Sequence, residues 1–204
     1  MLFDDAYKTI EIASEGIFRD KGSKFLAFAY PIKSEEEVKP FIAGLRAAHV
    51  KANHFCYAYR LTPNRSVFRV NDDGEPSGTA GRPILNCLLS EDITNILIVI
   101  VRYFGGTLLG VPGLINAYKN ASIEAIKAAT IISKTVNDVY EVYFDYLQMN
   151  DVMKLVKEEN IEVLAQQFDT QCVLKFEIRK NQLNQVLGKF DKITGIKLKY
   201  LQTI

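Results

Sequence analysis

Cysteine and histidine are scarce in this sequence, which holds three cysteines, two histidines and no tryptophan. Cys56, Cys87 and Cys172 lie too far apart to suggest a disulfide framework or a paired-cysteine zinc site. Buried free thiols in a reducing compartment are the simpler interpretation. His49 and His54 make a poor zinc pair without a third ligand. We therefore expect neither a metal ion nor a cofactor.

Excess charge and long hydrophobic runs are also lacking. The 25 Lys and Arg residues nearly balance the 24 Asp and Glu residues, and the formal net charge is +1. A global positive field is thereby excluded, so nucleic-acid binding would need a local patch. The strongest apolar run, residues 96–101, is too short to cross a bilayer. Residues 1–5 carry two acids and no basic segment, so we expect no secretory leader and a cytoplasmic protein without a membrane partner.

Apolar residues are plentiful enough for a packed core, because they make up 48% of the 204 positions. Residues 95–102 are apolar on both faces, which is the pattern of a central strand buried on two sides. Ser34 and the three glutamates after it mark the start of a helix. In the first two thirds of the chain we expect strands at residues 24–30, 54–61, 66–70 and 95–102, and helices at 34–49, 83–89 and 112–129.

The last third of the chain differs in composition, and no proline follows Pro112. Its patterns predict a strand at 136–146, a helix at 151–159, strands at 161–168 and 172–179, a helix at 182–190 and a strand at 195–201. This βαββαβ order is typical of a ferredoxin-like domain. We predict an α+β protein with two domains, residues 1–133 and 134–204.

Glycine is concentrated in one region, since seven of the twelve glycines lie between residues 74 and 113. Gly105, Gly106 and Gly110 follow the expected central strand and open a helix. Helix N-termini carry unpaired N–H groups that receive anions, and Arg102 just upstream could add a fork for phosphate. Close packing between a strand and a helix is the alternative explanation of the same glycines.

Three carboxylates, Asp72, Asp73 and Glu75, fall within four positions. They could bind a hard metal ion or act as a general acid and base. Alternatively, they bond the backbone of their own turn and pair with nearby arginines.

Arginines and aromatic residues are interleaved in the middle of the chain. Five of the eight arginines lie between residues 60 and 102, close to Tyr57, Tyr59 and Phe68, and five acids between residues 72 and 92 balance them. Arginine beside aromatic residues on a sheet is the composition of a platform for single-stranded RNA. A solvated sheet face with cross-strand charge pairs explains it equally well.

Two long blocks, residues 72–81 and 102–110, together resemble the IMPACT / YigZ family. Residues 22–25 and 54–60 support the resemblance, which covers about residues 1–130. The remainder resembles the small ferredoxin-like domain of bacterial members. Pro112 departs from the family, which usually has glycine there, and it removes one backbone N–H.

The resemblance implies an N-terminal α/β sandwich similar to the second domain of a small-subunit ribosomal protein, and two domains similar to parts of elongation factor G. Eukaryotic members look like translation regulators acting through a stress-kinase pathway. We therefore expect a non-enzymatic translation-linked regulator that binds RNA or the ribosome. The expected phosphate contacts are Arg82, Arg102, Gly105, Gly106 and Gly110, and the expected base-stacking residues are Tyr57 and Tyr59.

The alternative function is an enzyme acting on a small phosphorylated or nucleotide substrate. The glycine loop would then hold a small anionic ligand, with Asp72, Asp73 or Glu75 as base or metal ligand.

Overall fold

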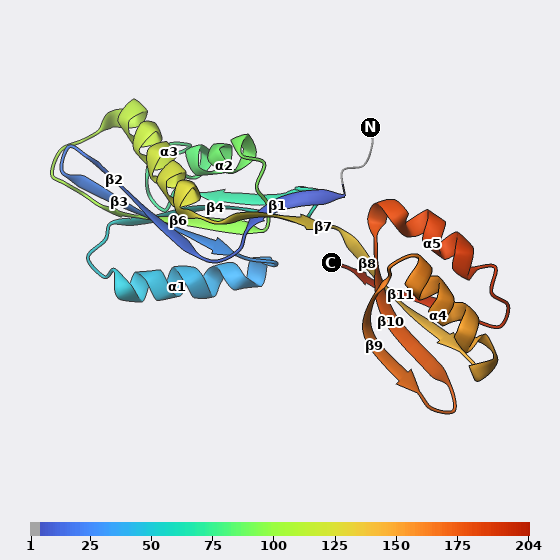
Figure 1. Cartoon of the computed structure of the whole chain (residues 1–204). Coiled ribbons are helices and arrows are strands. Elements are labelled where there is room, and N and C mark those ends of the chain that lie inside the picture. The colour runs from blue at the N-terminus through green and yellow to red at the C-terminus, as the bar shows by residue number, and fades with distance from the viewer. Residues whose placement is uncertain (1–4) are drawn as a thin grey trace. The chain divides into compact units, whose positions relative to one another are not determined.

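The computed structural model describes residues 5–204. The expectation that there is no secretory leader rests on residues 1–5, of which residues 1–4 lie outside the described part. The chain divides into two compact units, one of residues 7–134 and one of residues 135–204 with Asp5 and Ala6 (Figure 1). The predicted boundary, between residues 133 and 134, did not assign Asp5 and Ala6 to the second unit.

The N-terminal unit contains the longest helix, α3, which packs with α2 against one sheet (Figure 1). Its elements are β1 (Ala6–Ile10), β2 (Ser14–Asp20), β3 (Ser23–Pro31), the 3-10 turn Glu35–Glu37, α1 (Val38–Ala48), β4 (His54–Leu61), β5 (Val67–Asn71), α2 (Gly81–Ser90), β6 (Ile96–Tyr103), α3 (Gly110–Ala128) and β7 (Ile131–Thr135).

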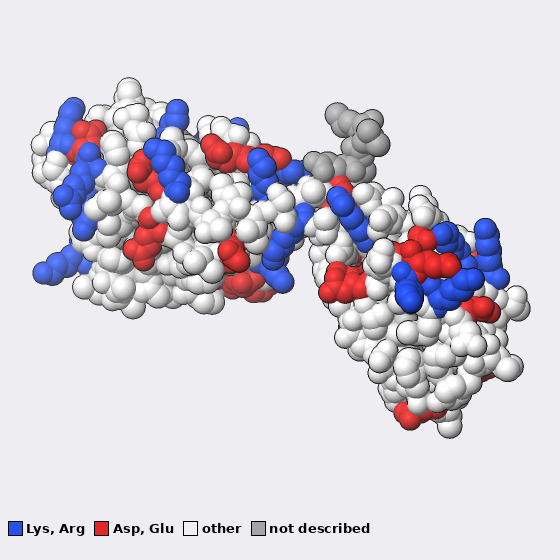
Figure 2. All heavy atoms as spheres, viewed as in Figure 1, with Lys and Arg blue, Asp and Glu red and all other residues white. Residues whose placement is uncertain are grey.

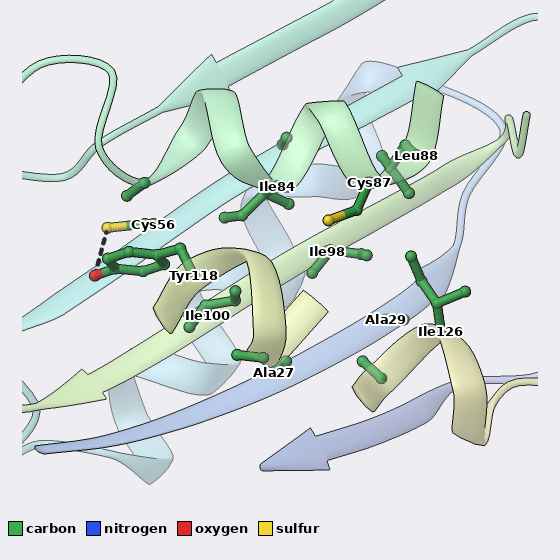
Figure 3. Close-up of a cluster of buried hydrophobic side chains, with 14 of the residues drawn as sticks. Ala27, Ala29, Cys56, Ile84, Cys87, Leu88, Ile98, Ile100, Tyr118 and Ile126 are labelled. Carbon is green, nitrogen blue, oxygen red and sulfur yellow. Dashed lines mark hydrogen bonds between the residues drawn. The ribbon is translucent and has the colours of Figure 1, made fainter. Parts of the chain in front are cut away.

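Strand β6 is the centre of a five-stranded antiparallel sheet with the order β2-β3-β6-β4-β5. Residues 96–101 are fully buried because both faces of the sheet are covered, as the sequence predicted. Ile96, Ile98 and Ile100 pack under α2 and α3, and the alternate residues Leu97 and Val99 belong to the core that contains α1 residues. Figure 3 shows the first of these cores, with α2 and α3 side chains meeting over the strands.

Strand β2 was not expected, because its sequence Ser-Glu-Gly-Ile-Phe-Arg-Asp carries charges and a glycine. The close approach of α3 explains why residue 16 is a glycine, because a Cβ atom there would collide with the backbone of Glu124 and Ala125. A strand glycine often marks such a close approach. The short pair β1–β7, a separate two-stranded sheet, was also not expected.

The C-terminal unit has the predicted ferredoxin-like order of elements. They are β8 (Asn137–Phe144), the 3-10 turn Tyr146–Gln148, α4 (Met149–Glu158), β9 (Glu162–Phe168), β10 (Cys172–Arg179), the 3-10 turn Lys180–Gln182, α5 (Leu183–Phe190) and β11 (Lys197–Thr203). The strands pair in the order β11-β8-β10-β9, and all neighbours are antiparallel. Val142, Leu174 and Phe176 of this sheet pack against Val152 and Val186 of the two helices.

No helix among residues 5–204 is both long and apolar enough to span a membrane.

Candidate functional site

The acidic loop and the glycine loop meet at the end of β6. Arg102, the penultimate residue of β6, donates from Nη1 to Glu75 Oε1 at 2.5 Å, and both side chains are almost fully buried. Tyr118 of α3 donates its hydroxyl to the same oxygen at 2.7 Å. Glu75 therefore ties the loop after β5 to the central strand and to the helix that follows the glycine loop.

Cys56 extends this network beneath the loop. Its Sγ lies 3.3 Å from the Tyr118 hydroxyl and 3.0 Å from the carbonyl oxygen of Asp72, and Figure 3 shows the contact with Tyr118. Burial raises the pKa of Cys56 and of Tyr118 far above their ordinary values, and the nearby Glu75 acts in the same direction. Both groups therefore stay protonated at neutral pH, which does not suit a nucleophile.

The two aspartates of the loop bind protein groups. Asp72 accepts the N–H groups of Ala80 and Gly81 at 3.0 and 2.8 Å with one carboxylate oxygen, and that of Gly78 at 2.9 Å with the other. This carboxylate thus satisfies exposed donors at the start of α2, where negative charge is favourable. No local sequence pattern indicated that a residue eight positions before Ala80 would bind the first N–H groups of this helix.

Asp73 joins the loop to β4 and α1. One carboxylate oxygen lies 2.7 Å from Nη2 of Arg46, and the other accepts the N–H of Phe55 at 2.7 Å. Its carbonyl oxygen lies 2.8 Å from His54 Nδ1, so that nitrogen must carry the proton. His54 Nε2 then faces Glu75 Oε1 at 4.0 Å.

These partners bear on the two explanations of the acidic triplet. Asp72, Asp73 and Glu75 each bind backbone N–H groups, a hydroxyl or an arginine, which is the geometry of the turn explanation. No group of three or more His, Cys, Asp or Glu side chains among residues 5–204 is arranged to hold a metal ion. The geometry thus favours a structural role for the triplet over metal binding.

The Arg102 side chain is less accessible to solvent than a phosphate contact requires. Its guanidinium carbon lies 5.4 Å from the ring centre of Phe25 and 5.7 Å from that of Phe104. Its Nε finds no hydrogen-bond partner among the described residues. The side chain is only 6% exposed, so this donor is closed to an anion in this structure.

The glycine loop is held by the turn between β2 and β3. A Cβ atom at Gly105 would collide with the backbone of Gly22 and Ser23, so close packing explains this glycine. Gly106 and Gly110 have positive φ angles of 85° and 69° and are exposed. Pro112 falls in the first turn of α3, where its missing N–H would have no helical partner anyway.

The remaining predicted contacts differ in exposure. Arg82 is exposed at the second position of α2. Tyr57 and Tyr59 stack with their ring centres 6.5 Å apart, but Tyr59 is only 3% exposed, which leaves Tyr57 as the more accessible ring. Arg60 and Arg65 both pair with Asp92, which lies in the loop between α2 and β6, so these are not the cross-strand pairs of a solvated sheet face.

A group of cations surrounds the glycine loop, and no sequence pattern indicated it. Arg19, Lys21 and Lys24 lie on or beside the β2–β3 turn that contacts Gly105, and Lys51 lies two residues from Asn53, which accepts the N–H of Phe104 at 3.0 Å. Arg19, Lys21 and Lys51 are exposed and Lys24 is half-buried. We call these four residues the basic end. Figure 2 shows Lys and Arg side chains gathered at an end of the N-terminal unit.

Fold and site together define a class: an α+β protein whose larger unit joins an acidic loop to a glycine loop through buried Glu75 and Arg102. Residues 21–126, which include this whole site, match the family model described as the Impact N-terminal domain. The chain belongs to the IMPACT family, as the sequence blocks indicated.

Named relatives and a solved structure extend the likeness beyond that domain. An IMPACT family member of Haemophilus influenzae is 35% identical over 150 residues, covering 72% of this chain and 73% of the relative. IMPACT family member YigZ of Escherichia coli is 32% identical over 157 residues, 76% of this chain and 77% of its own. The crystal structure of a hypothetical protein, 25% identical, matches 97% of this chain and 98% of its own with a TM-score of 0.71.

Proposed function

We propose that this protein is a non-enzymatic, translation-linked regulator of the cytoplasm that binds RNA or the ribosome through its N-terminal unit. The observation that carries the proposal is the basic end, which places four cations around an exposed glycine loop. The resemblance of the sequence to the IMPACT family supports the link to translation, because it implies translation regulators among the eukaryotic members.

The chemistry of the basic end suits a phosphate backbone. None of its four side chains has an ion-pair partner within residues 5–204, and Asp20, between Arg19 and Lys21, is the acid of the same turn, so cations outnumber acids there. The exposed backbone of Gly106 and Gly110 adds N–H donors beside them. A chain with a net charge of only +1 can therefore still present a local positive surface.

Arg82 is proposed as a further phosphate contact and Tyr57 as a stacking ring. They do not form one surface with each other, because α2 covers one face of the sheet and Tyr57 packs with the α1 core on the other. Arg102 acts mainly by holding Glu75 and the loops in place. The enzyme alternative has less support, because Asp72, Asp73 and Glu75, its expected bases or metal ligands, already accept hydrogen bonds from protein groups.

The test is co-sedimentation of the full chain with ribosomes across a salt series. We expect binding that weakens with salt, because phosphate contacts release counterions. The triple variant Lys21→Gln, Lys24→Gln, Lys51→Gln should bind at least tenfold more weakly, and the slope of log affinity against log salt should fall by about 2 to 3.

The matched control is Lys33→Gln, Lys39→Gln, Lys134→Gln, which removes the same charge from exposed positions of the same unit. It should bind like the wild type. If both triple variants lose binding equally, the basic end is not the site. If the wild type fails to co-sediment at any salt concentration, the proposed function is wrong.

A further inference from the structure

A groove between α2 and α3 is separate from the site described above. It has a volume of about 560 Å³, within the range of roughly 300–1,000 Å³ typical of small-molecule sites. Helix α2 contributes Pro83, Asn86 and Cys87 to it, and β7 contributes Ile131. Figure 3 shows Cys87 on α2 beside α3.

The wall formed by α3 alternates apolar and basic residues. Ile115, Lys119, Ile123 and Lys127 line the groove at intervals of four residues, which places them on one face of the helix. Ile115 and Ile131 are 40% and 42% exposed, so apolar surface faces water along the groove. An apolar occupant would remove this surface from water.

The charges at the rim select the kind of occupant. Lys119 is exposed and makes no ion pair with any residue in the described part of the chain, whereas Lys127 pairs with Glu124 at 2.9 Å. Glu91 is the acid that lines the groove. A ligand with one negative group is therefore attracted to Lys119, while its apolar part contacts the isoleucines.

We propose that this groove binds a small amphipathic anion, with an apolar body between α2 and α3 and a carboxylate or sulfonate group at Lys119. The site does not depend on RNA or ribosome binding, because it uses none of the residues of the basic end.

Cys87 provides a direct reporter of occupancy. Cys87 is 6% exposed, whereas Cys56 and Cys172 are fully buried. Its Sγ contacts the carbonyl oxygen of Lys119, and burial raises the pKa of the thiol. Slow alkylation with N-ethylmaleimide, mapped by mass spectrometry, should thus modify Cys87 first.

The experiment titrates the full chain with 8-anilinonaphthalene-1-sulfonate, an aromatic body that carries one sulfonate. We expect saturable fluorescence and at least fivefold slower alkylation of Cys87 at saturation. Ile115→Gln should weaken binding at least fivefold, whereas Ile17→Gln, at a similarly exposed isoleucine outside the groove, should not change it.

The charge variants test the position of the head group. Lys119→Gln should weaken binding about three- to fivefold and leave the affinity for the uncharged dye Nile red unchanged. Lys127→Gln should change either affinity less than about twofold, because that ammonium already has a partner. Equal probe binding by all variants, or binding that leaves Cys87 alkylation unchanged, would overturn the proposal. So would self-association of the chain that protects Cys87 without the probe, since a second copy would then cover the groove.

Discussion

Glu75 is the residue that joins the two loops of the candidate site. Its Oε1 atom receives hydrogen bonds from Arg102 and Tyr118 in a place that is almost closed to water. Removing one partner of a buried ion pair leaves the other charge uncompensated, which costs more than losing an exposed pair.

Glu75→Gln should therefore lower the free energy of unfolding by about 3 kcal/mol, because Arg102 stays buried without its counter-charge. The measurement is urea unfolding followed by circular dichroism. Glu124→Gln removes an exposed pair with Lys127 and should cost less than about 0.5 kcal/mol. Adding Arg102→Met to Glu75→Gln should restore at least about 1 kcal/mol, since it removes the unpaired charge. A loss as small as that of the control would show that this ion pair does not hold the loops.

Residue types at the site could be predicted from the sequence, but their partners could not. The carboxylates and Arg102 stood out as candidates, and pairing of acids with arginines was one of two explanations. Tyr118 was missed, although a tyrosine in a helix of small residues was a signal that it fills a special place. Its contact with Glu75 joins residues 43 positions apart, a separation that no local pattern encodes.

At the scale of elements, the strong hydrophobic patterns were sufficient to predict the strands and helices that carry them. The buried strand β6 and the six expected strands and helices around it follow from hydrophobic periodicity and turn residues. Strand β2 was not predicted, because Gly16 allows α3 to approach closely. This tertiary requirement weakens the local strand pattern. The basic end was not predicted either, because it forms only where the β2–β3 turn meets the glycine loop in the folded protein.

The segment before β1 is linked to β10 by an ion pair with a defined pH dependence. Arg179 donates to both carboxylate oxygens of Asp5, at 2.8 and 2.9 Å. The hydrogen bond from Arg179 holds the pKa of Asp5 below its ordinary value, despite the opposing effect of burial. A carboxylate with a lowered folded-state pKa stabilises the fold above its unfolded-state pKa of about 3.9, and this contribution is lost as the pH falls through the folded-state value.

Asp5→Asn should therefore destabilise the C-terminal unit at pH 6 and reduce the difference in stability between pH 6 and pH 3. Urea midpoints at the two pH values measure this. Asp191→Asn, at an exposed position of the same unit, is the control and should keep the wild-type difference. An unchanged difference in Asp5→Asn would show that the ion pair contributes nothing to acid sensitivity.

At the scale of the whole molecule, each unit has hydrophobic cores of its own. The clusters around β6 contain only residues of the N-terminal unit, and the cluster around Val142 and Phe176 contains only residues of the C-terminal unit. The change in composition near residue 134 made two units predictable. The contacts between distant residues within one unit could not be predicted from the sequence, since they depend on strand order.

Separate cores predict separate responses to core mutations. Ile100→Ala and Leu174→Ala each remove a fully buried side chain, and each should cost about 2–5 kcal/mol within its own unit. Amide hydrogen exchange of the full chain should then quicken by roughly 30-fold or more in residues 7–134 for Ile100→Ala, with residues 135–204 unchanged. Leu174→Ala should give the opposite pattern. Faster exchange throughout the chain in either variant would mean that the two units unfold together as one cooperative structure.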